Sequence, residues 1–160
     1  MTLWRVALKI VKDIFGNYLI VAPAVAWLAA QIIKVFTGMF DKRKFSLRTL
    51  LFSNGGMPSS HSAAVCALAT GCVIKFGFSS FECAMSGIFA MIVMIDASGV
   101  RYETGEQAKV INKIAREIFS GRPEDINTGL KELVGHTPFQ VLMGAALGIL
   151  IGILMSFAML

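Results

Sequence analysis

Four long apolar stretches, separated by polar segments, constrain the fold of this chain more than any other feature of its sequence. A helix needs about 20 residues to cross a bilayer. The stretches run from about Tyr18 to Met39, from Ser59 to Phe78, from Phe81 to Ser98 and from Phe139 to Leu160. The last of them contains no charged residue. The sequence therefore predicts an all-α, polytopic membrane bundle with about four transmembrane helices.

The low content of charged residues agrees with this prediction. Only 16% of the 160 residues are charged, whereas a typical soluble domain has about 25%. The length allows one membrane domain over residues 1–160 and leaves no room for a second one. Cys66, Cys72 and Cys83 lie inside apolar runs and lack metal-site spacing, so we expect them to pack and expect no metal site.

The N-terminal segment, residues 1–16, has a different pattern. From Leu3 to Phe15, apolar side chains recur at helical spacing between Arg5, Lys9 and Lys12. This pattern is typical of an amphipathic helix that lies at the membrane interface. A charged beginning of the first span fits the same residues, so the sequence leaves both alternatives open.

Two polar segments connect the spans, in addition to a tight connection at residues 78–80. Asp41 to Met57 is basic and separates the first two spans, and Arg101 to Gly135 separates the last two. Within the second segment, Gln107 to Phe119 is predicted as an extramembrane surface helix, with a stop at Gly121-Arg122-Pro123.

The number of crossings brings the chemically interesting residues to one membrane face. The first span ends near Lys34, and the second begins at the same face with His61. The third span ends at this face with Asp96 and Arg101, and the fourth span begins at this face just after His136. Four crossings alone predict this gathering of five residues.

The distribution of lysine and arginine predicts which face this is. Ten of these residues flank the spans at the gathered face, namely Lys42, Arg43, Lys44, Arg48, Arg101, Lys109, Lys113, Arg116, Arg122 and Lys131. Four lie on the other side, namely Arg5, Lys9, Lys12 and Lys75. The positive-inside rule therefore predicts a plasma-membrane protein with the gathered face in the cytoplasm. A net charge of +5 beside apolar spans favours anionic lipid headgroups or phosphorylated substrates over nucleic acid, which we do not expect as a partner.

Both histidines of the chain stand where a membrane helix begins. His61 follows Pro58-Ser59-Ser60, and His136 precedes Thr137-Pro138. Helix N-termini offer free N–H donors and partial positive charge, which together bind anions such as phosphate. One such histidine is most simply a residue at the lipid interface, but two that converge on one face predict a phosphate site.

Charged residues near the ends of the spans support this site. Lys34 and Arg101 are costly close to lipid unless they are paired or functional, although Lys34 alone also fits a side chain that reaches the headgroups. The Arg101 fork suits phosphate oxygens. Asp96 lies in an apolar span and should have a partner; it could orient a base, pair with a cation or bind a metal.

Three sequence stretches together resemble a known superfamily. They are Gly56-Met57-Pro58-Ser59-Ser60-His61-Ser62-Ala63, Asp96-Ala97-Ser98-Gly99-Val100-Arg101 and Gly135-His136-Thr137-Pro138. They resemble the divergent bacterial and plant branch of the type 2 phosphatidic acid phosphatase and vanadium haloperoxidase superfamily. The resemblance covers the chain from about Asn17 to Leu160.

The resemblance implies a role for each matching residue. The histidine that attacks phosphorus and forms a phosphohistidine would be His136, and the one that protonates the leaving alkoxide would be His61. Ser59 and Ser60 would hold phosphoryl oxygens, and Lys34 looks like the lysine of the first motif. That mechanism requires no metal and no cofactor.

Three positions depart from the usual superfamily pattern. Asp41 and Leu130 stand where the first and last motifs have arginines, and Gln140 stands where an aspartate orients the attacking histidine. Arg101, Arg43 or Arg48 could replace the arginines, and Gln140 could accept a hydrogen bond from the ring.

Three functions therefore stay open at this point. The first is a phosphatase for a lipid phosphomonoester or pyrophosphate, such as phosphatidylglycerophosphate, phosphatidic acid or a prenyl phosphate. The second is a lipid phosphotransferase, and the third is a non-catalytic protein that binds lipid phosphates. We expect membrane lipids as partners in every case, and a homo-oligomer stays open.

Overall fold

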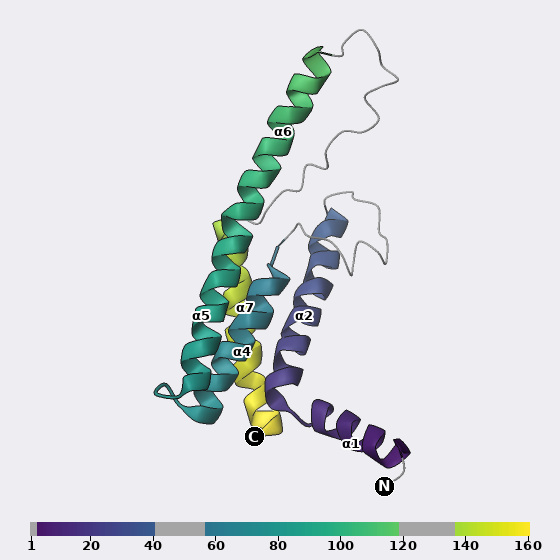
Figure 1. Cartoon of the computed structure of the whole chain (residues 1–160), viewed down its shortest axis with the longest axis vertical. Coiled ribbons are helices and arrows are strands. Elements are labelled where there is room, and N and C mark those ends of the chain that lie inside the picture. The colour runs from purple at the N-terminus through teal and green to yellow at the C-terminus, as the bar shows by residue number, and fades with distance from the viewer. Residues whose placement is uncertain (1–2, 41–56, 119–136) are drawn as a thin grey trace.

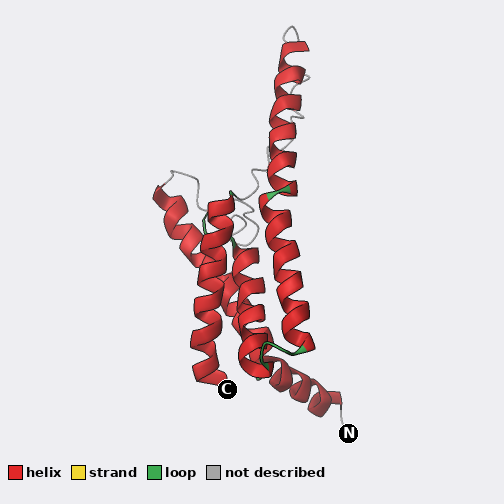
Figure 2. Ribbon diagram, turned by 90° about the vertical axis from the view of Figure 1, so that its left-hand side faces the viewer, coloured by secondary structure: helices red, strands yellow, loops and turns green. Residues whose placement is uncertain are grey.

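The computed structural model describes residues 3–40, 57–118 and 137–160, and all regular secondary structure in these ranges is helical. The helices are α1 (Leu3–Phe15), α2 (Tyr18–Phe40), α4 (Ser60–Phe76), α5 (Phe81–Ser98), α6 (Val100–Ile118) and α7 (Pro138–Met159). Figures 1 and 2 show α2, α4, α5 and α7 side by side, with α6 projecting beyond them. The predicted all-α membrane bundle is confirmed.

Three of the described helical stretches are long and apolar enough to cross a membrane. They are Tyr18–Phe36, Phe81–Ala115 and Pro138–Met159. The predicted second span is the apolar helix α4, which has 17 residues and is shorter than the other three. Because α4 packs between the longer helices, neighbouring side chains rather than lipid surround most of it.

Contacts between distant residues fix the direction of each helix. The Tyr18 hydroxyl, at the start of α2, donates to the carbonyl of Gly152 near the end of α7 (2.5 Å). The Lys34 ammonium, in the second half of α2, donates to Ser60 at the start of α4 (3.2 Å). Helix α2 is therefore antiparallel to α4 and to α7, whereas α4 and α7 run parallel to each other. The end of α2, the start of α4, the end of α5 and the start of α7 share one end of the bundle (Figure 1). We call it the site end.

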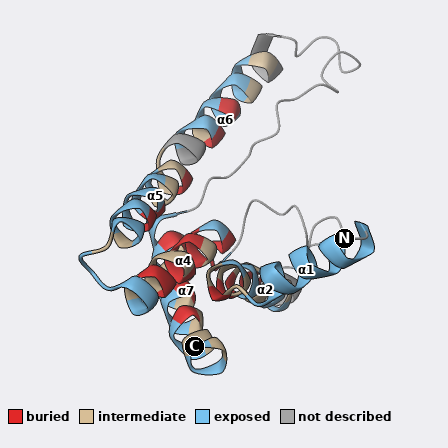
Figure 3. Ribbon diagram, turned by 60° about the horizontal axis from the view of Figure 1, so that its bottom comes forward, coloured by how far each residue is buried: buried red, intermediate tan, exposed pale blue. Residues whose placement is uncertain are grey.

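Small side chains bring α2 and α4 close together. Ala26 and Ala30 of α2 pack against Ala63 and Ala67 of α4, and all four are fully buried. Figure 3 shows that the buried residues gather on α4 and on the faces of α2 and α7 that meet it. Close packing of small residues stabilises membrane helices because lipid offers no hydrophobic drive for their association.

Glycines on α7 allow an even closer contact with α4. Gly144, Gly148 and Gly152 recur every four residues and so lie on one face. A Cβ atom at Gly144 would collide with the carbonyl oxygen of Ser59, and one at Gly148 with the carbonyl oxygen of Ala63. The two backbones therefore touch, and this contact fixes the start of α4 relative to α7.

Helix α6 begins earlier than the sequence indicated. The predicted extramembrane helix started at Gln107, whereas α6 starts at Val100, directly after α5. Gly99 does not interrupt the hydrogen bonds, because its N–H donates to Ile95 and its carbonyl accepts from Glu103. The predicted start is wrong for this reason. The predicted stop at Gly121-Arg122-Pro123 lies outside the described residues.

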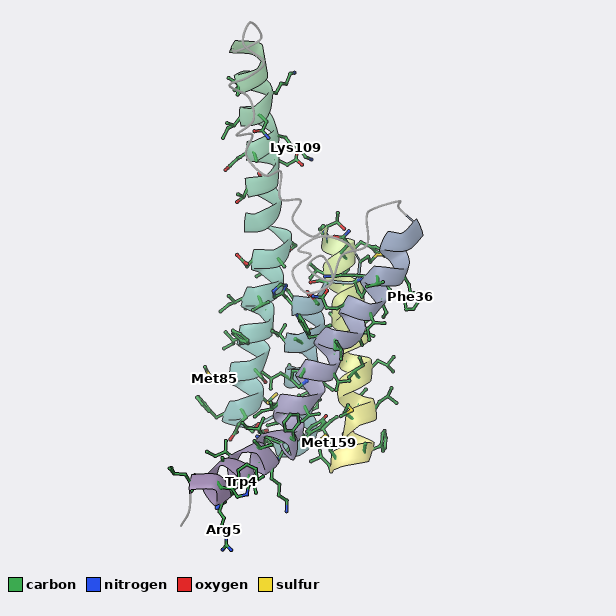
Figure 4. The ribbon with its side chains drawn as sticks, turned by 90° about the vertical axis from the view of Figure 1, so that its right-hand side faces the viewer. Trp4, Arg5, Phe36, Met85, Lys109 and Met159 are labelled. Atoms are coloured by element: carbon green, nitrogen blue, oxygen red, sulfur yellow. The ribbon has the colours of Figure 1, made fainter. Side chains whose placement is uncertain are left out.

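The N-terminal segment forms a helix that is separate from the first span. Helix α1 ends before Gly16, and α2 begins at Tyr18 at an angle to it (Figures 1 and 4). Trp4 and Arg5 lie at the end of the molecule opposite Phe36, which follows Lys34 in α2 (Figure 4). None of the α1 residues is buried. Its position at a membrane interface stays a prediction.

Candidate phosphate-binding site

The first turn of α4 carries three buried hydroxyl groups. Ser59 is the N-cap, and its side chain accepts hydrogen bonds from the N–H of Ser62 (3.4 Å) and from the Ser62 hydroxyl (3.0 Å). Ser59, Ser60 and Ser62 are at most 2% exposed. Serine caps a helix well because its oxygen satisfies a free N–H of the first turn. The turn is therefore rigid and directs its remaining N–H groups and its dipole toward the site end.

A buried ammonium group faces this turn. Lys34 is only 9% exposed, and its Nζ donates to the Ser60 Oγ atom at 3.2 Å. Helical side chains lean toward the N-terminus of their helix, so the Lys34 side chain covers the preceding turn of α2 rather than the lipid surface. A lysine charge together with a helix N-terminus forms an environment that attracts anions.

The beginning of α7 is joined to the same turn. The N–H of Ser59 donates to the backbone carbonyl of Gln140 (3.0 Å). Thr137 is the N-cap of α7, and its side chain and that of Gln140 form a capping box, in which the amide oxygen of Gln140 accepts from the Thr137 N–H (3.2 Å). The residue before Thr137 is His136, so the described chain enters α7 at the site.

His61 of α4 and Asp96 of α5 belong to the parts of these helices that lie at the site end. His61 is exposed in the first turn of α4, while its neighbours Ser60 and Ser62 are buried. The Sγ atom of Cys66 lies 3.8 Å from the Sδ atom of Met94. This antiparallel register brings the first turn of α4 level with the last turn of α5, where Asp96 is half-buried. The predicted gathering of His61, Asp96 and Lys34 at one end is therefore present.

Several predicted site residues lie outside the described part of the chain. They are His136, Arg43 and Arg48. Arg101 belongs to the first turn of α6, at the site end, but its side chain is outside the described residues. The roles of these four residues stay predictions.

Two polar residues of the site region were not expected from the sequence. Ser62 holds the Ser59 side chain, and Gln31 is buried on α2 one turn before Lys34. The sequence signal that could have identified them is a polar residue within an apolar span, three positions from a predicted site residue: Ser62 from Ser59, and Gln31 from Lys34. Such spacing puts two residues on one helix face, but it does not reveal which neighbour that face meets.

Comparison with known proteins agrees with the resemblance seen in the motifs. The model of the divergent PAP2 family matches residues 15–151, which include α2, α4, α5, α6 and most of α7. The uncharacterized membrane protein YuiD of Bacillus subtilis (strain 168) is 39% identical over 155 residues, which cover 91% of this chain and 98% of that protein. No solved structure matches the chain. With this coverage, the chain is a membrane protein that belongs to the divergent PAP2 family.

Proposed function

We propose that this protein is a membrane-embedded phosphatase that hydrolyses a lipid phosphomonoester or pyrophosphate. One observation carries the proposal: the buried Lys34 ammonium contacts Ser60 in the serine-rich first turn of α4. A lysine held inside a membrane bundle is costly unless it serves a ligand or a partner. A phosphoryl group fits, because it accepts hydrogen bonds from the ammonium, from the hydroxyls and from the N–H groups of the turn.

The position of the site favours a lipid substrate. Lys34 lies within the apolar stretch Tyr18–Phe36, and Ser59 and Ser60 are enclosed by α2 and α7. A lipid presents its phosphate at this depth while its acyl or prenyl chain stays in the bilayer. The charge distribution supports a cytoplasmic site.

The proposed reaction proceeds in two steps. In the first, a neutral nitrogen of His136 attacks phosphorus, the bond from phosphorus to the lipid oxygen breaks, and His61 gives its proton to that oxygen. In the second, water attacks the phosphohistidine, inorganic phosphate leaves, and His61 takes the proton from the water. Lys34, Ser59 and Ser60 stabilise the charge on the phosphoryl oxygens in both steps.

A non-catalytic protein that binds lipid phosphates is the second candidate. The observation that favours it is the capping box of α7, in which the Gln140 side chain holds the Thr137 backbone. An amide in this position does not supply the carboxylate that would stabilise a charged imidazole of His136. Binding without turnover needs only the part of the site formed by Lys34 and the first turn of α4.

Phosphate release from purified protein distinguishes these candidates. We expect release from at least one of phosphatidylglycerophosphate, phosphatidic acid and undecaprenyl phosphate, and its loss in His136→Ala and His61→Ala. Acid quenching with labelled lipid should trap a phosphohistidine in the wild type. Transfer of the label to an added alcohol in place of water would identify a phosphotransferase, and binding without release would identify a non-catalytic protein.

A further inference from the structure

Gln31 is a buried polar residue that the proposed reaction does not use. It is 4% exposed, and its Oε1 atom has no hydrogen-bond partner among the described residues. A buried carbonyl oxygen without a donor lowers stability, and lipid supplies no donor at this depth. Leucine or methionine would fill the position at less cost. The amide oxygen therefore indicates a partner that arrives from outside the protein.

The position of Gln31 connects it with the phosphate site. The buried face of α2 consists of Tyr18, Ala22, Ala26, Ala30 and Lys34, and Gln31 borders this face one turn before Lys34. The exposed residues Ile32 and Ile33 lie on the opposite, lipid-facing side.

The neighbours on α4 and α7 define the depth of Gln31. Because Lys34 contacts Ser60 and Ala30 packs against Ala63, the antiparallel register puts Gln31 level with Ser62 and Ala63 of α4. At this level Gly148 of α7 packs its backbone against the Ala63 carbonyl of α4. Gln31 thus lies one helical turn farther into the bilayer than Lys34 and Ser60, which belong to the proposed phosphate site.

We infer that Gln31 accepts a hydrogen bond from a hydroxyl group that the substrate carries next to its phosphate. The inference rests on the proposed function and names the substrate class: glycerol-based lipid phosphates with a free hydroxyl, in preference to polyprenyl phosphates. Three residues of helix span about 4.5 Å, which suits the four bonds that separate phosphorus from the hydroxyl oxygen on the neighbouring glycerol carbon.

Other donors fit this position less well. An ionised phosphoryl oxygen accepts hydrogen bonds and would meet Lys34 and the first turn of α4 instead. A lipid amine would bring a second positive charge close to the buried Lys34 ammonium. A hydroxyl donates without adding charge, which suits an amide acceptor in an apolar interior.

The test compares two lipids that differ by one hydroxyl. The first is 1-oleoyl-glycerol 3-phosphate, which has a free 2-hydroxyl, and the second is its 2-deoxy analogue. For the wild type we expect kcat/KM to be at least about tenfold higher for the hydroxyl lipid, because a site built for a hydroxyl rejects an analogue that lacks it. In Gln31→Met, kcat/KM should fall for the hydroxyl lipid alone, so the ratio of the two kcat/KM values should come close to one. Ile33→Met, on the lipid-facing side of the same turn, should keep the wild-type ratio.

The outcomes separate the inference from the proposed function. Equal kcat/KM values of the wild type for both lipids would show that the amide has another partner, such as water, and would overturn the inference. An equal loss on both lipids in Gln31→Met, with a lower unfolding temperature, would show a structural role and also overturn it.

A wild type that releases no phosphate from any lipid tested would refute the proposed phosphatase activity. The inference about Gln31 is then tested by measuring how the two lipids bind. Ligands that bind the folded state raise its unfolding temperature. In the wild type, the hydroxyl lipid should raise the unfolding temperature more than the deoxy lipid does. In Gln31→Met, the two lipids should raise it equally. Equal increases in the wild type would overturn the inference.

Discussion

At the residue scale, the contact between Lys34 and Ser60 explains how a membrane helix can hold a buried charge. The ammonium loses most of its hydration at 9% exposure, and the Ser60 hydroxyl at 3.2 Å compensates part of that loss. In the proposed function, the phosphate of the substrate adds an interaction with its negative charge. The residue is therefore expected to contribute more to the bound state than to the free protein.

Removal of this charge gives the first prediction. Lys34→Met should lower kcat/KM for the lipid phosphate by about 10²-fold or more, because a preorganised donor to the phosphoryl oxygens is lost. Lys75→Met is the matched control: Lys75 lies at the opposite end of α4, over the ring of Phe76, and its replacement should leave kcat/KM unchanged. Initial rates of phosphate release measure both. Wild-type rates in Lys34→Met would remove Lys34 from the site.

At the element scale, helix caps and glycines position the site. Ser59 and Ser80 are both N-caps, of α4 and α5 respectively, and each accepts a hydrogen bond from an N–H of its helix. Only the first lies at the site end. Variants of Ser59 and Ser80 can therefore be compared to separate the contribution of a cap to stability from a contribution to the proposed reaction.

Ser59→Ala and Ser80→Ala should each lower the free energy of unfolding by about 1 kcal/mol, the usual value of an N-cap. Ser59→Ala should in addition lower phosphate release, because its hydroxyl holds Ser62 and is proposed to bind a phosphoryl oxygen, whereas the backbone bond from Ser59 to Gln140 is kept. Unfolding in mixed micelles measures stability, and release assays below the unfolding range measure activity. Equal activity of the two variants would exclude a role for Ser59 beyond the cap.

The glycines of α7 give a second prediction at this scale. Gly148→Ala should destabilise the protein by about 1–3 kcal/mol, because the new Cβ meets the Ala63 carbonyl and forces α7 away from α4. Gly87→Ala is the control: no atom lies within 4 Å of a Cβ at Gly87, so the variant should keep or slightly raise stability through its better helix propensity. Unfolding midpoints in detergent compare the two. A Gly148→Ala variant as stable as Gly87→Ala would contradict the backbone contact.

At the scale of the whole molecule, the alternating directions of α2, α4, α5 and α7 along the chain assign each connection to a membrane face. Phe78 follows α4 and precedes α5, so it lies at the end of the bundle opposite the site. Lys109 of α6 lies beyond the site end (Figure 4). The lysine and arginine distribution predicts that Lys109 lies in the cytoplasm.

Labelling of intact cells tests this orientation. In a chain whose three cysteines are replaced by alanine, Phe78→Cys should react with a membrane-impermeant maleimide, and Lys109→Cys should react only after the cells are opened. The reverse pattern would place the site on the outer face. Reaction of both residues from the same side would contradict the arrangement of the helices.

The sequence predicted the spans well because apolar length and caps are local signals. The bounds of α5 follow from the Ser80 cap and from the glycine after Ser98. The start of α6 was missed because a polar stretch after a span favours a loop, whereas Gly99 keeps its helical hydrogen bonds. Whether a helix continues past the membrane depends on such backbone geometry and not on hydropathy.

The site was predictable in part for a similar reason. Counting crossings brought Lys34, His61 and Asp96 to one end, and the capping serines were visible in the sequence. The proposed role of Gln31 could not be predicted from the sequence, because its depth depends on the helix register that the alanine and glycine contacts set. Register between helices is a property of packed surfaces and has no signal in a single segment.

The backbone contact between α4 and α7 makes the two walls of the site unequal in stiffness. Ser59 cannot shift without moving Gly144 and Gln140, so α7 and the first turn of α4 with its hydroxyls behave as one solid piece. The wall formed by α5 meets α4 through flexible side chains such as Met94, which adapt to changes in spacing. A change of spacing between the helices at the site end is therefore expected to occur by outward tilting of α5 with its attached α6, while the first turn of α4 keeps its position on α7.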